Sequence, residues 1–290
     1  MSRRRTSGLV KNLFGDSLYQ KRAREVFPIL VRQAIAQQKI TYAQLAEEVG
    51  IPNPRNLNYV LGSIGTTLIE LGKKWREKIP AIQCLVVNGA TGLPGDGADE
   101  FIKRRSTIQK LSLRQKDALV MKVLAEVFAY PKWGAVMQAL ELEPATRGAG
   151  PEIEAARVIG AKGESKAHRE LKEFVSLNPH SVGLTPEFGP GKTEFSLPSG
   201  DSIDVVFQRK AAWIAVEVKS RISTEQDITR GLFQCVKYRA ILDAWRGYLG
   251  DLAEVRVILV LEKQLPLKLV ALRNTLGVKV IENVSAGRNS

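Results

Sequence analysis

The sequence predicts two domains: a mainly α-helical first domain, and a second, α/β domain in which helices flank a mixed β-sheet. The chain has 290 residues, which is enough for two ordinary domains. A stretch rich in proline and glycine, residues 144–152, indicates a linker between them. Nearly all regular segments before this stretch have a helical pattern, whereas strands and helices alternate after it. We therefore expect a flexible basic arm over 1–15, a helical domain over 16–145, a linker over 146–160, the α/β domain over 161–284 and a disordered tail over 285–290.

Start and stop signals divide the first domain into helices. Thr41 precedes a helical pattern that ends at Gly50, and Ser112 forms a capping box with Gln115 three residues later. Further helices are expected over 16–37, with a kink at Pro28, over 54–72, from residue 112 to Tyr130, and in a short segment up to Leu142. The apolar run 78–88 predicts a strand, and the glycine-rich run 89–97 predicts a tight loop.

The second domain is predicted to begin with a helix and three consecutive strands. The expected order is helix 163–177, strands 193–197, 203–208 and 212–219, helix 224–247, strand 254–261, helix 265–276 and strand 277–283. Residues 212–218 are almost wholly apolar, which predicts a central strand that is buried on both faces. The order α-β-β-β-α-β, extended by α-β, favours a mixed sheet flanked by helices.

Charged residues interrupt two of these apolar strands. Asp204 lies on the strand 203–208, and Glu217 and Lys219 lie two residues apart on the next strand. Alternate residues of a strand point to the same face, so Glu217 and Lys219 should lie side by side. Buried charges are costly unless they are paired or bind a metal. Two carboxylates and a lysine at one sheet edge suit a Mg²⁺ ion and a phosphate. The alternative is a cross-strand salt bridge in an inert sheet.

This arrangement resembles the PD-(D/E)xK, restriction-endonuclease-like superfamily of nucleases. The strand order and the motif Asp204…Glu217-Val218-Lys219 carry the resemblance, which covers residues 160–262. It implies that Asp204 and Glu217 bind Mg²⁺, with Mn²⁺ as a substitute, and that Lys219 orients or activates the attacking water. A lysine beside a metal in a dry site can have a depressed pKa and assist proton removal. Ile203 stands where the motif has proline, a position that carries no chemistry.

Two helices are expected to complete the site. Members of the superfamily often add an acid from the first core helix, and Glu164 is the candidate here, as a further metal ligand, unless it is simply an acid favoured by the dipole at the start of the helix. His168 falls on the same helical face and would touch a phosphate or the metal's water molecules, unless it is a packed core residue. Gln234 and Tyr238 resemble the Gln-x-x-x-Tyr element of exonuclease-like members, in which the glutamine approaches the active site and the tyrosine supports it. The same helix carries two cations that would meet the DNA backbone, Arg230 and Lys237.

The first domain resembles the winged-helix part of the alkyltransferase-like DNA-binding family. Residues 41–64 have a helix-turn-helix rhythm, Ile79-Pro80 falls where that family begins a strand, and residues 89–97 fall at its wing. The alkyl-accepting cysteine is absent, so only the scaffold is implied. Base edges would be reached from the start of the second helix, by Asn53, Arg55, Asn56 and Asn58. Phosphate contacts are expected from Lys73, Lys74, Arg76, Lys78, Lys103, Arg104 and Arg105, unless these are simply solvated side chains.

The composition narrows the partners and the cellular location. The net charge is +13, and residues 1–150 carry 23 Lys and Arg against 13 Asp and Glu, a balance of +10. This favours nucleic acid as partner, with an anionic membrane as the rival, although no apolar run reaches the roughly 18 residues of a membrane span. Two isolated cysteines argue against a disulfide framework or a zinc cluster and favour the reducing cytoplasm. With only two histidines, metal chemistry should be based on carboxylates.

Together these features predict a cytoplasmic, nucleoid-associated, Mg²⁺-dependent endonuclease that acts on DNA, with double-stranded DNA favoured. By analogy with the superfamily it would serve restriction or anti-phage defence. The alternatives are a repair or recombination nuclease, and a non-catalytic DNA-binding regulator with a nuclease-like fold. Cutting both strands requires either two active sites, as in a homodimer, or two sequential nicks.

Overall fold

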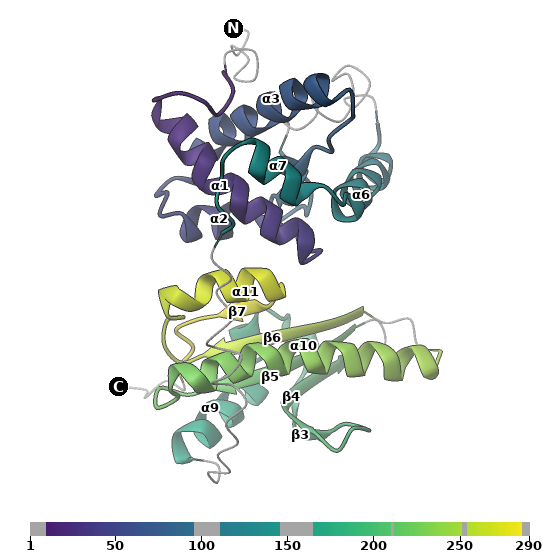
Figure 1. Ribbon diagram of the computed structural model, residues 1–290. Coiled ribbons are helices and arrows are strands. Elements are labelled where there is room, and N and C mark those ends of the chain that lie inside the picture. Colours follow the sequence, from purple (N-terminus) through teal and green to yellow (C-terminus); the bar gives the residue numbers. More distant parts are fainter. Residues whose placement is uncertain (1–9, 96–110, 146–164, 210–211, 251–253, 286–290) are drawn as a thin grey trace, which may run out of the picture. The chain divides into compact units, whose positions relative to one another are not determined.

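The computed structural model describes residues 10–95, 111–145, 165–209, 212–250 and 254–285. The chain divides into two compact units, residues 1–146 and 147–290. The first is mainly helical and the second is a mixed α/β unit with a five-stranded sheet, so the predicted fold class is confirmed at this level (Figure 1). Within the ranges described, no helix combines the length and the apolar character needed to cross a membrane.

Two long helices, α1 (Leu18–Ile35) and α3 (Leu57–Trp75), pack together in the first unit (Figure 1). Phe27, Leu30 and Ile64 are fully buried in the core that these helices share. The remaining elements are α2 (Tyr42–Glu48), α6 (Leu113–Ala129), α7 (Trp133–Ala139), the 3₁₀ segments η2 (Pro54–Asn56) and η3 (Ile82–Leu85), and the parallel strands β1 (Ile40–Thr41) and β2 (Val86–Val87). The predicted caps are confirmed, because Thr41 and Ser112 each accept a hydrogen bond from the backbone three residues on.

The strand predicted over 78–88 is wrong. Most of this run forms the 3₁₀ segment η3, and only Val86 and Val87 are extended. The backbone turns at Pro80, whose carbonyl accepts from the N–H of Ile82 at 2.9 Å. Every side chain from Ile82 to Val87 is buried. The sequence therefore has no alternation of apolar and polar residues, which is the pattern that would distinguish a strand from a compact turn.

The expected flexible arm over 1–15 is also wrong for residues 10–15, which are packed on α3. Leu13 is fully buried, and its N–H donates to Thr67 Oγ1 at 2.9 Å. Arg24 secures the same segment through Nη1, which donates to the carbonyl oxygens of Leu13 at 2.6 Å and Gly15 at 2.9 Å. An apolar residue within the basic sequence therefore fixes this segment to the core. Residues 1–9 lie outside the described ranges.

The second unit contains one mixed sheet in the order β3-β4-β5-β6-β7. Its strands are β3 (Lys192–Ser196), β4 (Ser202–Arg209), β5 (Ala212–Lys219), β6 (Glu254–Leu261) and β7 (Lys279–Ile281). The first three are antiparallel neighbours, and the last three are parallel. The helical elements are α9 (Lys166–Leu177), α10 (Glu225–Tyr248), α11 (Val270–Leu276) and the 3₁₀ segments η5 (Pro179–Val182), η6 (Pro186–Phe188) and η7 (Leu267–Leu269). This is the element order that the sequence predicted.

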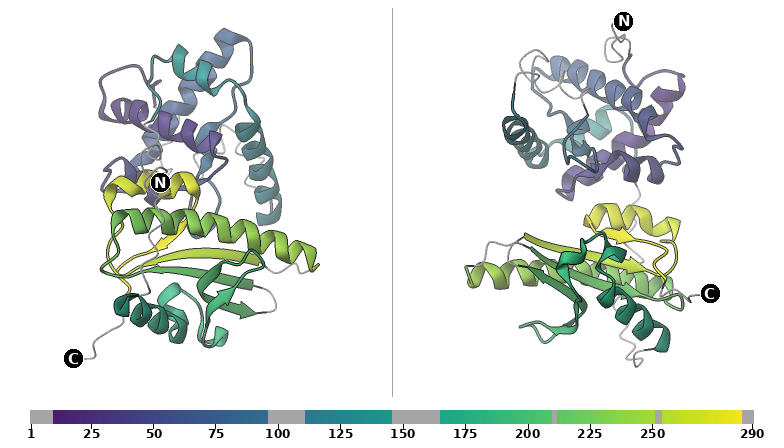
Figure 2. Two further views of the ribbon diagram at one scale, coloured as in Figure 1. Left: turned by 60° about the horizontal axis from the view of Figure 1, so that its bottom comes forward. Right: turned by 180° about the vertical axis from the view of Figure 1, so that it is seen from behind.

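Helices cover both faces of this sheet: α9 lies on one face, and α10 and α11 lie on the other (Figure 2). Along β5, Ile214, Val216 and Val218 join the core on the α9 side. Ala215 joins the core on the α10 side. Because side chains alternate along a strand, Glu217 and Lys219 leave β5 on the α10 side.

Candidate active site

A hydrogen bond joins Asp204 to the strand that carries Glu217 and Lys219. It lies on β4, and its Oδ2 accepts a hydrogen bond from the backbone N–H of Val218 on β5 at 2.8 Å. Val218 stands between Glu217 and Lys219 in the sequence. The paired strands therefore hold the Asp204 carboxylate beside both of these residues, as the sequence predicted.

Glu217 and Lys219 form a buried ion pair. Lys219 Nζ lies 2.6 Å from Glu217 Oε1, and the Glu217 side chain is only 4% exposed. Burial raises the pKa of Glu217 to about 7; the Lys219 ammonium opposes this rise, and the Asp204 carboxylate adds to it. The carboxylates of Asp204 and Glu217 therefore lie close together in a poorly solvated place. A bound cation would reduce the repulsion between them.

The direction of the Lys219 shift is opposite to the depressed pKa that the sequence suggested. Burial alone would lower the pKa of Lys219, but the carboxylates of Glu217, Asp204 and Asp227 together outweigh it and the net direction is upward. Lys219 therefore carries a positive charge at neutral pH. In this geometry it is suited to stabilising negative charge rather than to removing a proton.

Gln234 and Tyr238 on α10 form a chain of hydrogen bonds that begins at Lys219. Gln234 Oε1 accepts from Lys219 Nζ at 3.3 Å, and Gln234 Nε2 donates to Tyr238 Oη at 3.2 Å. Tyr238 Oη donates in turn to the carbonyl oxygen of Ser202 at 3.0 Å, at the beginning of β4. One turn of α10 thus links Lys219 on β5 to the strand that carries Asp204.

His168 approaches the site from the opposite side, on α9. Its Nε2 lies 3.3 Å from Asp204 Oδ1, with side-chain exposures of 21% and 14%. Burial would raise the pKa of Asp204, but His168 and the Val218 N–H outweigh it, so the pKa of Asp204 is lowered and the carboxylate stays ionised at neutral pH. Glu164, the predicted acid of this helix, lies outside the described residues.

Opposite Asp204, the edge strand β3 is distorted at Glu194. The paired positions Thr193↔Val205 and Phe195↔Ile203 flank this point, and Glu194 itself has a left-handed φ of 50°. The Glu194 carboxylate makes an ion pair with the buried Lys172 of α9 and accepts from Ser202 Oγ at 3.1 Å. Sequence reasoning missed Lys172 and Glu194, because a backbone distortion in a polar edge strand leaves no mark in residue type or spacing.

The donor set suits a small divalent cation. Asp204 and Glu217 offer carboxylate oxygens, which are the ligands that Mg²⁺ and Mn²⁺ take in proteins. In the described part of the chain, no group of three His, Cys, Asp or Glu side chains is arranged to hold a metal. Mg²⁺ is usually held by one or two carboxylates, with water and substrate phosphates completing its shell, so two carboxylates are sufficient on chemical grounds.

The predicted nucleic-acid contacts of α10 are ion-paired at the surface. Lys237 Nζ lies 2.6 Å from Asp201 Oδ1 and remains 52% exposed, while Arg230 Nη1 lies 3.6 Å from Asp227 Oδ1 and is 34% exposed. Both side chains are accessible, but a phosphate would compete with an existing carboxylate partner.

In the first unit, the predicted contacts fall at the two ends of α3. Arg55, Asn56 and Asn58 are exposed near its beginning, and Asn53 caps the preceding turn through Oδ1. Exposed cations stand at its end: Lys73, Lys74 and Arg76. The two groups are about 27 Å apart along the helix. The predicted residues Lys103, Arg104 and Arg105 lie outside the described ranges, and Lys78 is ion-paired with Glu126 at 2.7 Å.

The middle of α3 is covered by the segment of residues 10–15. Val10 packs against Gly62, Leu13 binds Thr67, and Asn12 Nδ2 donates to Glu70 Oε2 at 2.8 Å. The predicted set on α3 therefore does not form one continuous face for a DNA groove. It consists of two separate groups of exposed residues.

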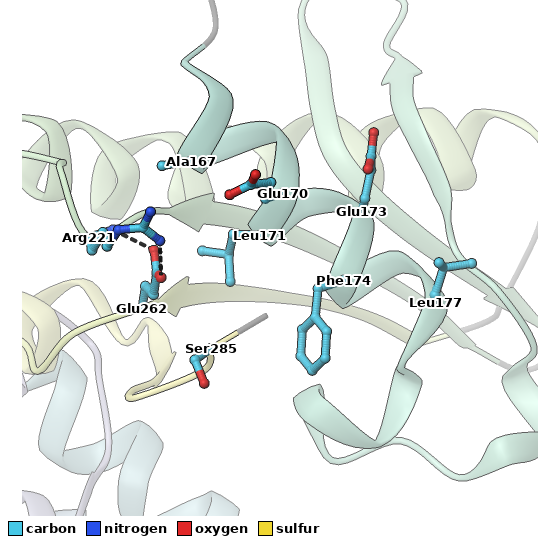
Figure 3. Close-up of a pocket in the computed structure, with 9 residues that line it drawn as sticks. All are labelled: Ala167, Glu170, Leu171, Glu173, Phe174, Leu177, Arg221, Glu262 and Ser285. Carbon is cyan, nitrogen blue, oxygen red and sulfur yellow. Dashed lines mark hydrogen bonds and ion pairs between the residues drawn. The ribbon is translucent and has the colours of Figure 1, made fainter. Parts of the chain in front are cut away.

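A pocket of about 700 Å³ lies beside α9 and does not include the three charged strand residues (Figure 3). Its polar lining consists of Glu170, Glu173, Arg221, Glu262 and Ser285. Arg221 Nη1 is bound to Glu262 Oε1 at 2.9 Å. Three carboxylates against one guanidinium repel a polyanion, so this pocket does not suit a nucleic-acid backbone.

Comparison of the chain with protein-family models, with curated proteins and with solved structures gave no match.

Proposed function

We propose that this protein is a divalent-metal-dependent nuclease that hydrolyses phosphodiester bonds of DNA. The observation that carries the proposal is the convergence of Asp204, Glu217 and Lys219, in which Asp204 is bonded to Val218 between the other two. The bracing of Lys219 by Gln234 supports it. The residues correspond to the motif that resembles the PD-(D/E)xK superfamily, and a restriction-endonuclease-like core is the finer assignment that we propose for the α/β unit.

Each residue has a distinct role in this proposal. Asp204 and Glu217 would hold the cation, which supplies a water of lowered pKa and polarises the scissile phosphate. Lys219 has three N–H donors, and the described contacts with Glu217 and Gln234 occupy two of them. The third would be directed at a phosphate oxygen, where the positive charge stabilises the negative charge that develops during attack.

The choice of DNA as substrate rests on charge and on the first unit. The chain carries a net charge of +13, and cations stand exposed at the end of α3. We assign the first unit as the DNA-binding part, with a winged-helix-like scaffold, and we favour double-stranded DNA. A defence nuclease is the biological role most in keeping with this combination.

Plasmid cleavage tests the proposal directly. Wild-type protein with Mg²⁺ or Mn²⁺ should nick or linearise DNA, and EDTA should stop the reaction. Asp204→Asn and Lys219→Met should lose about 10²-fold or more in rate while they still bind DNA. Asp243→Asn is the matched control, because Asp243 is exposed on α10 and should be replaced without loss. Wild-type rates in Asp204→Asn and Lys219→Met would show that the site is assigned wrongly.

One observation also favours a non-catalytic DNA-binding protein. A buried Glu217–Lys219 pair satisfies both charges without any ligand, as an inert sheet would require. The cleavage experiment distinguishes the nuclease from the non-catalytic DNA-binding protein. A protein that binds DNA but leaves plasmid, phage, single-stranded and RNA substrates intact with either ion is a binding module.

A further inference from the structure

Two tyrosines from different helices meet at the surface of the first unit. Tyr19 lies on α1 and Tyr59 on α3, and their ring centroids are 6.4 Å apart with the ring planes tilted by 44°. The backbone N–H of Lys11 donates to Tyr19 Oη at 3.4 Å, which joins the segment of residues 10–15 to the first ring. Tyr19 is half-buried, whereas Tyr59 is 45% exposed. The Tyr59 ring therefore rests against a supported neighbour and still offers an aromatic surface to solvent.

Exposed cations that have no acidic partner in the described part of the chain flank this pair. Lys11 adjoins Tyr19, and Arg55 stands one helical turn before Tyr59. Within the described residues neither cation is ion-paired, whereas Lys78 of the same unit is paired with a glutamate. Both side chains can therefore meet a phosphate without first giving up a carboxylate.

The surroundings of the pair keep a positive charge. Asp16 is the acid nearest to Tyr19 in the sequence, and it is outnumbered by three cations, Lys11, Arg22 and Arg55. Arg22 stands one turn after Tyr19 on α1, on the same side of the helix. Aromatic rings beside cations are the combination that binds single-stranded nucleic acid, because the rings stack on bases while the cations neutralise the backbone.

We propose that Tyr59, supported by Tyr19, is a stacking site for an unpaired base of single-stranded DNA. The phosphates next to that base would meet Lys11 and Arg55. Base faces are covered inside a duplex, so the site would act on an unpaired end, gap or loop, in addition to the duplex that we favour for cleavage. The inference extends DNA binding by the first unit and does not depend on the cleavage site proposed on β4 and β5.

The test is binding of two labelled oligonucleotides to the full chain in EDTA, measured by fluorescence anisotropy. One is single-stranded oligothymidine, and the other is an abasic strand with the same number of phosphates. Wild-type protein should bind oligothymidine about tenfold more tightly, which is the usual scale of one stacked base. Tyr59→Ala should lose this difference and keep its affinity for the abasic strand, because the phosphate contacts remain. Tyr59→Phe should keep the difference, because the ring remains.

Two further variants serve as controls. Tyr248 is 88% exposed on α10 of the second unit, and Tyr248→Ala should keep the full preference for oligothymidine. Arg55→Gln should weaken binding of both strands alike, because it removes a phosphate contact and no ring. Thermal melting verifies that each variant is folded.

Equal affinity of the wild type for the two strands, or an unchanged preference in Tyr59→Ala, would overturn the inference. Either result would leave the nuclease proposal intact, because plasmid cleavage tests that proposal separately. Conversely, a wild type that prefers oligothymidine but never cleaves plasmid would support the stacking site and refute the nuclease. Sedimentation velocity tests a second copy of the chain as the occupant. Self-association that Tyr59→Ala abolishes would assign the tyrosine pair to a protein interface instead.

Discussion

The backbone of Gly231 on α10 lies directly against the side chain of Lys219. A Cβ atom at position 231 would be 2.9 Å from Lys219 Cε and 3.0 Å from Leu259 Cδ1. Alanine is normally favoured over glycine inside a helix by about 1 kcal/mol. Glycine is therefore present here at a cost in helix stability, and it leaves the room in which Lys219 reaches Glu217 and Gln234.

The first prediction concerns this contact. Gly231→Ala should displace the Lys219 ammonium and reduce cleavage by about 10²-fold, because a small misplacement of a catalytic group has a large effect on rate. Stability and DNA affinity should change little, since the flexible end of a lysine can move aside. Single-turnover cleavage and thermal melting measure the two effects. Gly247→Ala on the same helix is the control: a Cβ there meets nothing within 4 Å, so it should add stability and leave cleavage unchanged. Equal cleavage rates in the two variants would contradict the prediction.

The second prediction concerns Tyr238, which is 3% exposed and joins Gln234 to the carbonyl oxygen of Ser202. Tyr238→Phe removes this link while the ring still fills the core. The rate of cleavage should fall about tenfold as Gln234 loses its support. The free energy of unfolding should fall by about 1 kcal/mol, the usual contribution of a hydrogen bond. Tyr248→Phe is the matched control, because Tyr248 is 88% exposed on the same helix. A normal rate in Tyr238→Phe would show that Gln234 is held in place by other contacts.

Contacts of the site that lie within a single strand or a single helix could be predicted from the periodicity of the sequence. The period of two along β5 placed Glu217 and Lys219 on one face, and their 2.6 Å contact follows from it. Likewise, the four-residue spacing on α10 placed Gln234 and Tyr238 within hydrogen-bond distance. Long apolar runs also gave the bounds of β5 and β6, because central parallel strands are buried on both faces.

The contacts that the sequence did not predict depend on tertiary packing. That His168 meets Asp204 depends on how α9 lies across the sheet, which no spacing along the chain specifies. The burial of Leu13 on α3 was not predicted, because its apolar segment is short and follows a strongly basic run at the start of the chain. Residues 78–88 were wrongly predicted as a strand, because a run of buried apolar residues is compatible with both a strand and a 3₁₀ turn.

The third prediction concerns pH and metal removal. The folded-state pKa of Glu217, about 7, lies above its ordinary value of 4.5, so the folded protein holds this proton more tightly than the unfolded chain does. In EDTA, this group should lower the free energy of unfolding by about 3 kcal/mol as pH rises from 4.5 to 7. Glu217→Gln should lack this decrease, so the difference between the two proteins, measured by urea unfolding at several pH values, isolates it. At pH 8, Mn²⁺ should restore stability to the wild type and not to Glu217→Gln, because the ion binds only the folded state. Parallel pH profiles for the two proteins would contradict the assignment.

The last prediction concerns DNA binding by the end of α3. Each lysine or arginine that contacts a phosphate contributes about 0.9 to the slope of log affinity against log salt concentration. Replacing Lys73, Lys74 and Arg76 together with glutamine should therefore lower this slope by up to about 2.7, and weaken binding to all DNA sequences alike. Lys78→Gln serves as the contrast, because Lys78 is already paired with Glu126 and should contribute less. Fluorescence anisotropy over a series of salt concentrations measures both slopes. An unchanged slope in the triple variant would remove the end of α3 from the proposed DNA-binding surface. It would not bear on the cleavage site proposed on β4 and β5.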